Sequence, residues 1–106
     1  MKTSAVQVLR WDKGEPPTEA EIEQLLAEER LSGYRWSNAP GDTYAAHSHG
    51  YHKVIYVARG SIVFGLPELS EQVELRAGDR LELPAGVRHD ARVGPHGVVC
   101  IEAHRS

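Results

Sequence analysis

The feature that most constrains this chain is the series of short apolar segments that follows Gly33. These segments are rich in Val, Ile, Tyr and Leu, and Gly or Pro separates them at intervals of roughly ten residues, as is typical of antiparallel strands. We predict strands at 34–38, 43–47, 54–58, 61–64, 71–75, 80–83, 88–93 and 97–103. So many short strands indicate a sandwich or a barrel, which protects strand edges by packing or closure.

Two dipeptides between these segments, Arg59-Gly60 and Ala77-Gly78, are predicted to form tight turns. Glycine favours such positions because it adopts backbone angles that other residues avoid.

The N-terminal third differs from the rest of the chain. Residues 6–9 are predicted to form a short strand, and Thr18 with Glu21 forms a capping box for a helix. Ile22, Leu25 and Leu26 share one face of that helix, which is therefore amphipathic. We predict one domain, in which residues 1–33 form the strand and the helix, and residues 34–106 form the barrel.

Composition narrows the class of function. With 106 residues the chain fits one domain, and a net charge of -3 without a basic stripe argues against nucleic-acid and membrane-surface partners. Cys100 is the single cysteine, so no internal disulfide forms. The first residues are too short an apolar run for a signal peptide, and no segment reaches membrane-spanning length. We expect a cytoplasmic protein.

The histidines form the most informative chemical pattern. His47 and His49 are two residues apart, so on a strand both imidazoles point to the same face. Neutral imidazole is the commonest metal ligand in proteins, although two histidines at this spacing are also common on protein surfaces without a metal.

Two spaced motifs resemble those of the cupin superfamily. The family pattern G-x5-H-x-H-x3-E-x6-G corresponds to Gly41, His47, His49, Lys53 and Gly60, with lysine in place of glutamate. The pattern G-x5-P-x-G-x2-H-x3-N corresponds to residues 78–93, with valine in place of asparagine at the end.

The resemblance implies an all-β fold, the cupin double-stranded β-helix or jelly-roll barrel, with one short N-terminal helix. It also implies that His47, His49 and His89 bind one divalent metal ion inside the barrel. Imidazole suits several ions, so Fe, Zn, Ni and Mn stay open. Pro84 and Gly86 are expected to shape the turn before His89.

Lys53 leaves three alternatives, because an ammonium group is repelled by a metal cation. It can be neutral and act as a catalytic general base, or as a fourth ligand. It can stay charged and hold a substrate carboxylate or phosphate. It can also turn to solvent, or to an acidic partner such as Glu82 or Glu102.

Strand parity assigns the neighbouring side chains. Tyr51 has the parity of His49 and is predicted to line the substrate pocket together with Lys53, whereas Tyr44 is predicted to face away. His52 is expected on the opposite face. His96 is expected in a turn and His104 in solvent.

Three functions fit these features. The first is a metalloenzyme acting on a small polar or anionic molecule, as a dioxygenase-type oxidoreductase or an isomerase. The alternative is a non-enzymatic cupin that binds or senses a small ligand, and the third is a metal-free barrel with hydrogen-bonded histidines. Since one-domain cupins commonly pair, we expect a homodimer.

Overall fold

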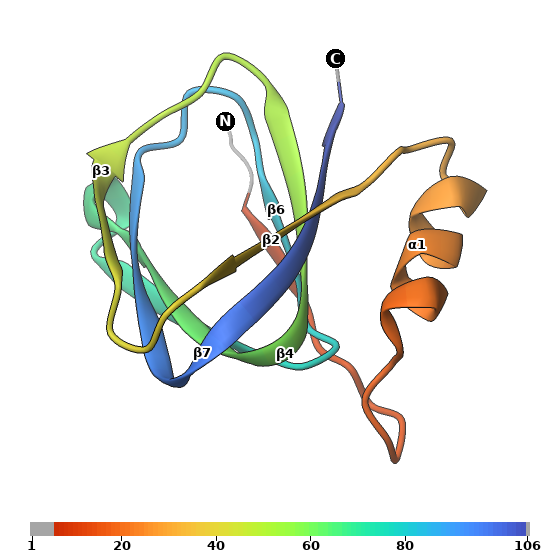
Figure 1. The fold of residues 1–106 in the computed structure, drawn as a ribbon. Helices are drawn as coiled ribbons and strands as arrows, with labels where there is room; N and C mark the ends of the chain where they lie inside the picture. The colour runs from red at the N-terminus through yellow and green to blue at the C-terminus, as the bar shows by residue number, and fades with distance from the viewer. Residues whose placement is uncertain (1–5, 106) are drawn as a thin grey trace.

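The protein, described here by a computed structural model covering residues 6–105, is a barrel of antiparallel strands with one helix outside it (Figure 1). Its elements are β1 (Gln7–Leu9), α1 (Glu19–Glu28), β2 (Tyr34–Asn38), β3 (Thr43–His47), β4 (His52–Leu66), the 3₁₀ helix η1 (Pro67–Leu69), β5 (Glu71–Arg76), β6 (Arg80–Leu83) and β7 (His89–Arg105). The predicted all-β jelly-roll class, with one short N-terminal helix, is confirmed.

The two long strands β4 and β7 organise the barrel. They pair with each other along most of their length, and β1, β6, β4, β7 and β2 follow one another across the sheet. On its other edge, β4 pairs with β6 in its first half and with β5 in its second half. On its other edge, β7 pairs with β3 in its first half and with β2 in its second half. Each long strand replaces two of the shorter strands that the sequence predicted.

The predicted tight turn at Arg59-Gly60 is wrong, because β4 continues through it as a bulged strand. The pairing of β4 with β7 shifts register between Val57 and Arg59, and again between Gly60 and Ile62. Gly60 has a φ of +77°, and a Cβ there would lie 2.0 Å from the carbonyl oxygen of Gly97 on β7. Glycine therefore allows the two strands to approach closely where they bend. The other predicted turn, at Ala77-Gly78, is confirmed.

The bulge also changes which residues of β4 point into the barrel. Ile55 and Val57 point inward before it, whereas Ile62 and Phe64 do so after it. The interior cluster is apolar and comprises Ile55, Val57, Ile62, Phe64, Leu66, Leu75, Leu81, Leu83, Ala91, Val93, Val98 and Cys100. The odd step between Val57 and Ile62 keeps both halves of the strand facing one core.

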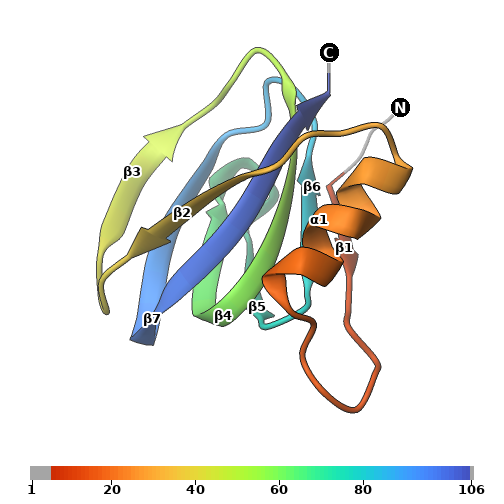
Figure 2. The ribbon, with the colours of Figure 1, turned by 45° about the vertical axis from the view of Figure 1, so that its right-hand side comes forward.

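Helix α1 covers the outer face of β4 and β7 (Figure 2). The predicted capping box is present: the amide of Glu21 donates to Thr18 Oγ1 at 3.1 Å, and the amide of Thr18 donates to Glu21 Oε1 at 2.8 Å. Ile22 and Leu26 are fully buried against the outer side of the barrel wall. Within residues 6–105, no helix has the length and apolar character needed to cross a membrane.

Candidate metal centre and its cavity

The structure brings together the three histidines that the sequence singled out. His47 ends β3 and pairs in register with His89, the first residue of β7, while His49 lies in the loop just beyond β3. One ring nitrogen from each of the three lies within 4.8 Å of the others. Two separate motifs therefore converge on one point.

A backbone hydrogen bond joins the two histidine-bearing segments. The amide of Gly86 donates to the carbonyl oxygen of His49 at 2.8 Å. Gly86 has a φ of +84°, in the left-handed region that glycine tolerates, and the amide of Val87 closes the turn on the carbonyl of Pro84. The expected turn at Pro84 and Gly86 is thus present, and it fixes His49 relative to His89.

Each imidazole is held through its Nδ1 atom. In His47 and His89 this atom donates to the backbone carbonyl two residues earlier, at 2.7 and 3.0 Å. In His49 it lies 3.2 Å from the hydroxyl of Tyr51. Such contacts orient metal-binding histidines and leave Nε2 for a ligand. Among the described residues, Nε2 of His49 is the buried side-chain nitrogen that lacks any hydrogen-bond partner.

The environment favours neutral imidazoles. Burial lowers the pKa of both His49 and His89, and the nearby ammonium of Lys53 lowers both further. A neutral ring offers the lone pair that a metal ion needs. Three converging imidazoles, one of which has an unpartnered buried nitrogen, therefore fit a divalent metal ion.

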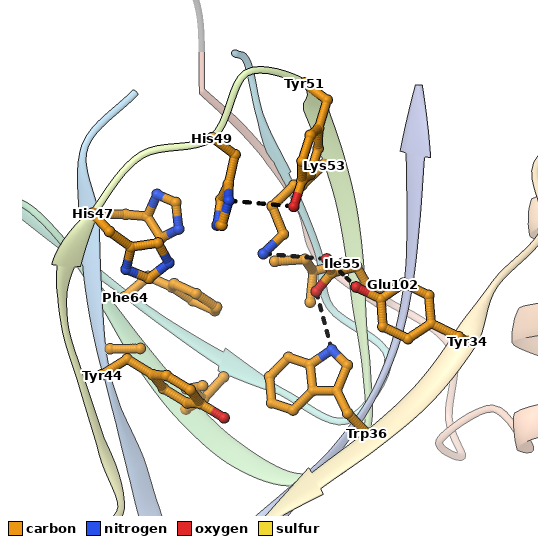
Figure 3. Close-up of a pocket in the computed structure, with 13 residues that line it drawn as sticks. Tyr34, Trp36, Tyr44, His47, His49, Tyr51, Lys53, Ile55, Phe64 and Glu102 are labelled. Carbon is orange, nitrogen blue, oxygen red and sulfur yellow. Dashed lines mark hydrogen bonds and ion pairs between the residues drawn. The ribbon is translucent and has the colours of Figure 1, made fainter. Parts of the chain in front are cut away.

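A cavity of about 310 Å³ lies beside the histidines, inside the barrel (Figure 3). Its lining is aromatic and aliphatic apart from the histidines and one charged pair, and consists of Tyr34, Trp36, Tyr44, His47, His49, Tyr51, Lys53, Ile55, Ile62, Phe64, His89, Ala91 and Glu102. Tyr51 and Lys53 are both among the lining residues.

The predicted orientation of Tyr44 is wrong, since its side chain lines this cavity instead of facing away from it. The pairing of β3 with β7 shifts register between Tyr44 and His47, so the simple alternation of faces fails there. The ring of Tyr44 meets that of Trp36 edge to face, with 6.3 Å between the ring centroids.

Lys53 forms an ion pair with Glu102 inside the cavity. Its Nζ lies 3.2 Å from Glu102 Oε2, and the two side chains are only 13% and 3% exposed. Glu102 pairs in register with Ile55, two residues along β4, so a long side chain reaches it diagonally across the ladder. Of the three alternatives for Lys53, the structure shows the pairing with an acidic residue. That residue is Glu102, which holds the lysine side chain toward the cavity.

Four donors surround the carboxylate of Glu102. Its Oε2 accepts from the Tyr34 hydroxyl at 2.7 Å and lies 2.7 Å from His104 Nε2, while Oε1 accepts from Trp36 Nε1 at 3.0 Å. Burial raises the pKa of Glu102, but these hydrogen bonds and Lys53 outweigh it, so the pKa is below its usual value.

Sequence reasoning named Glu102 as one of two possible partners of Lys53, but it did not predict that Glu102 lines the cavity. The available signal was a glutamate inside the apolar run at residues 97–103.

The remaining histidines lie outside the centre. His52 is on the opposite face, as expected, with Nε2 2.8 Å from Glu82 Oε1. His96 is exposed, but it lies within β7 instead of a turn. His104 is exposed, as expected, and its Nε2 also lies 2.7 Å from Glu102 Oε2.

Comparison with known proteins supports these observations. A family model described as "Cupin domain" matches residues 34–100. An RmlC-like cupin from Shewanella frigidimarina is 26% identical over 70% of this chain and 64% of that chain, with a TM-score of 0.60. No curated protein matches the chain.

Two further solved structures share the fold. A DUF861 family protein from Thermotoga maritima is 16% identical over 95% of this chain and 100% of that chain, with a TM-score of 0.62. The polyketide cyclase RemF from Streptomyces resistomycificus is 24% identical over 70% of this chain, with a TM-score of 0.60. The chain spans 64% of the Shewanella protein and 54% of RemF.

Proposed function

The chain belongs to the cupin family, and on that premise we propose that it is a metal-binding cupin whose His47, His49 and His89 hold one divalent ion. The orientation of the rings carries the proposal, because each Nδ1 is engaged and each Nε2 is left for a shared ligand. Without a ligand, Nε2 of His49 stays buried and unpaired, which costs free energy. Fe, Zn, Ni and Mn are the candidate ions.

The activity that suits this site best is the oxidation of a small molecule, of the dioxygenase type. A bound ion supplies Lewis-acid activation of coordinated oxygen atoms, and iron adds redox chemistry. His47, His49 and His89 would hold the ion, and the adjoining cavity would receive the substrate. Trp36 and Tyr44 line the cavity, where their rings exclude water (Figure 3).

An isomerase is supported less well, because proton abstraction needs a free base. Among the described residues that line the cavity, Lys53 is paired with Glu102, and Glu102 is occupied by four donors. We therefore assign Lys53 a binding role instead of a catalytic one. The same lack of a free base favours the alternative function, a non-enzymatic cupin that binds or senses a small ligand.

Metal content tests the proposal. We would purify the unmodified protein, His47→Ala, His89→Ala and the control His96→Ala, whose ring is exposed, without chelator or metal-affinity resin. We expect bound metal in the parent and the control and its loss in the other two variants. A parent that holds no ion, even after incubation with Fe²⁺ or Zn²⁺, would overturn the metal centre. Oxygen uptake with diketones, thiols or catechols then separates the enzyme from the binding protein.

Other parts of the assignment remain predictions from the sequence: one domain divided at residues 33 and 34, a homodimer, and a cytoplasmic location. In the described chain, β1 pairs with β6 alone and β2 with β7 alone, so each leaves one edge available to a second copy.

A further inference from the structure

We propose that the cavity selects small organic carboxylates, and that Lys53, held in place by Glu102, binds the carboxylate beside the metal position. This inference rests on the proposed metal centre. It adds the charge class of the ligand and names the residue that recognises it.

Glu102 anchors Lys53 and is not free to bind a ligand. An ionised carboxylate offers about four acceptor sites. In this chain, donors from Tyr34, Lys53 and His104 converge on Oε2, and the indole of Trp36 donates to Oε1. Four donors therefore engage the carboxylate before any ligand enters, and three of them crowd Oε2.

Lys53, in contrast, has donors to spare. An ammonium group carries three N–H donors, and in the described structure Glu102 is its ion-pair partner. The side chain lines the cavity and is almost buried, so the remaining donors face the ligand space and not solvent (Figure 3). Buried donors need acceptors, which a ligand has to provide.

The charges in the cavity favour an anion. The charges of Lys53 and Glu102 offset each other, and the three residues that would hold the ion are histidines, so no unpaired protein carboxylate offsets a divalent ion at this site. The aromatic walls alone would also suit a cation. A bound metal ion and the ammonium of Lys53 repel a cation, and both attract an oxygen anion placed between them.

The walls select the kind of anion. No arginine is among the described residues that line the cavity, so the several donors that phosphate usually engages are not provided there. Apart from the charged pair and the histidines, the walls include Trp36, Tyr44, Phe64 and Ile55, which suit a flat apolar body. The volume of about 310 Å³ is at the small end of the range for ligand pockets, roughly 300–1,000 Å³. A carboxylate of about the size of benzoate fits these limits.

Calorimetric titration of the Zn²⁺-loaded protein tests the charge class. Benzoate, benzamide, benzylamine and inorganic phosphate serve as probes, because the first three share one ring and differ in charge. We expect benzoate to bind at least about tenfold more tightly than benzamide, with no detectable binding of benzylamine or phosphate. Equal affinities for benzoate and benzamide, or tighter binding of phosphate, would overturn the inference.

Substitutions test the role of Lys53. Lys53→Met should reduce the preference for benzoate over benzamide, because the metal ion alone then attracts the carboxylate, whereas the control Lys13→Met, at an exposed lysine outside the cavity, should leave the preference unchanged. If Lys53→Met does not fold, the double variant Lys53→Met/Glu102→Gln carries the same test, since it removes both charges. A preference for benzoate over benzamide that is undiminished in Lys53→Met contradicts the inference.

Zn²⁺ affinity, measured separately, distinguishes the two proposals. If the parent binds no Zn²⁺, the proposed metal centre fails. If it binds Zn²⁺ but does not prefer benzoate, only the present inference fails.

Discussion

Breaking the buried ion pair has a cost that can be worked out from its surroundings. Removing one partner of a buried pair typically costs about 3–5 kcal/mol, because the other charge is left uncompensated. Three donors stay on Glu102 after Lys53→Met, so we expect the lower end, about 3 kcal/mol. In a domain of about 100 residues each kcal/mol lowers Tm by about 4–8 °C, so Tm should fall by more than about 10 °C.

The reverse substitution and the double variant complete a thermodynamic cycle. Glu102→Gln leaves the ammonium of Lys53 buried and turns an amide N–H₂ toward donors, so it should cost at least as much as Lys53→Met. Lys53→Met/Glu102→Gln leaves no unpaired charge. Its effect should be smaller than the sum of the single effects by at least about 1 kcal/mol.

Urea unfolding of the metal-free protein in the presence of a chelator measures these values, since a bound ion would add its own stabilisation. Tryptophan fluorescence follows the transition, and Trp36 lies at the pair itself. If each single substitution lowers the free energy of unfolding by less than about 1 kcal/mol, and the two effects simply add in the double variant, the pair contributes no more than an exposed surface ion pair. That result would refute the anchoring of Lys53 by Glu102.

Two further predictions concern pH and the bulge. The carboxylate of Glu102 has a lowered pKa because hydrogen bonds and Lys53 outweigh the effect of burial. The stability that this carboxylate gives the fold is therefore complete above its unfolded-state pKa of about 4.3. That stability is lost as pH falls through the folded-state pKa. Urea midpoints should therefore fall from pH 5 to pH 3. If the midpoint of Glu102→Gln falls as steeply with pH as that of the parent, Glu102 is not the source of the pH dependence. Gly60→Ala should destabilise the fold by at least about 2 kcal/mol in the same assay, because of its positive φ and its contact with Gly97. Gly14→Ala, with open space around its Cα, is the control, and equal midpoints for the two variants would rule out a close crossing.

The strand pattern could be read from the sequence, but the continuity of the strands could not. Glycine with a positive φ serves both a tight turn and a bulge, so Gly78 and Gly60 give the same local signal. Only the approach of Gly97, far along the chain, distinguishes them. The same limit applies to Tyr44, whose face is set by a register shift that strand parity does not reveal.

The candidate site divides in the same way. The resemblance of the two motifs to the cupin patterns implied that His47, His49 and His89 belong together, and the structure brings them together. The partner of Lys53 could not be chosen from the sequence, since Glu82 and Glu102 both belong to strands that pair with β4. The choice depends on which face of the barrel wall each glutamate occupies.

The buried pair of Lys53 and Glu102 also limits the order in which this sequence can diverge. A change at position 53 alone leaves a carboxylate without its ammonium group, and a change at position 102 alone leaves the reverse. Each single step passes through a less stable protein, so descendants of this chain should alter the two positions together. A lineage that acquires glutamate at position 53 is therefore expected to replace Glu102 as well, because two carboxylates would otherwise be buried side by side.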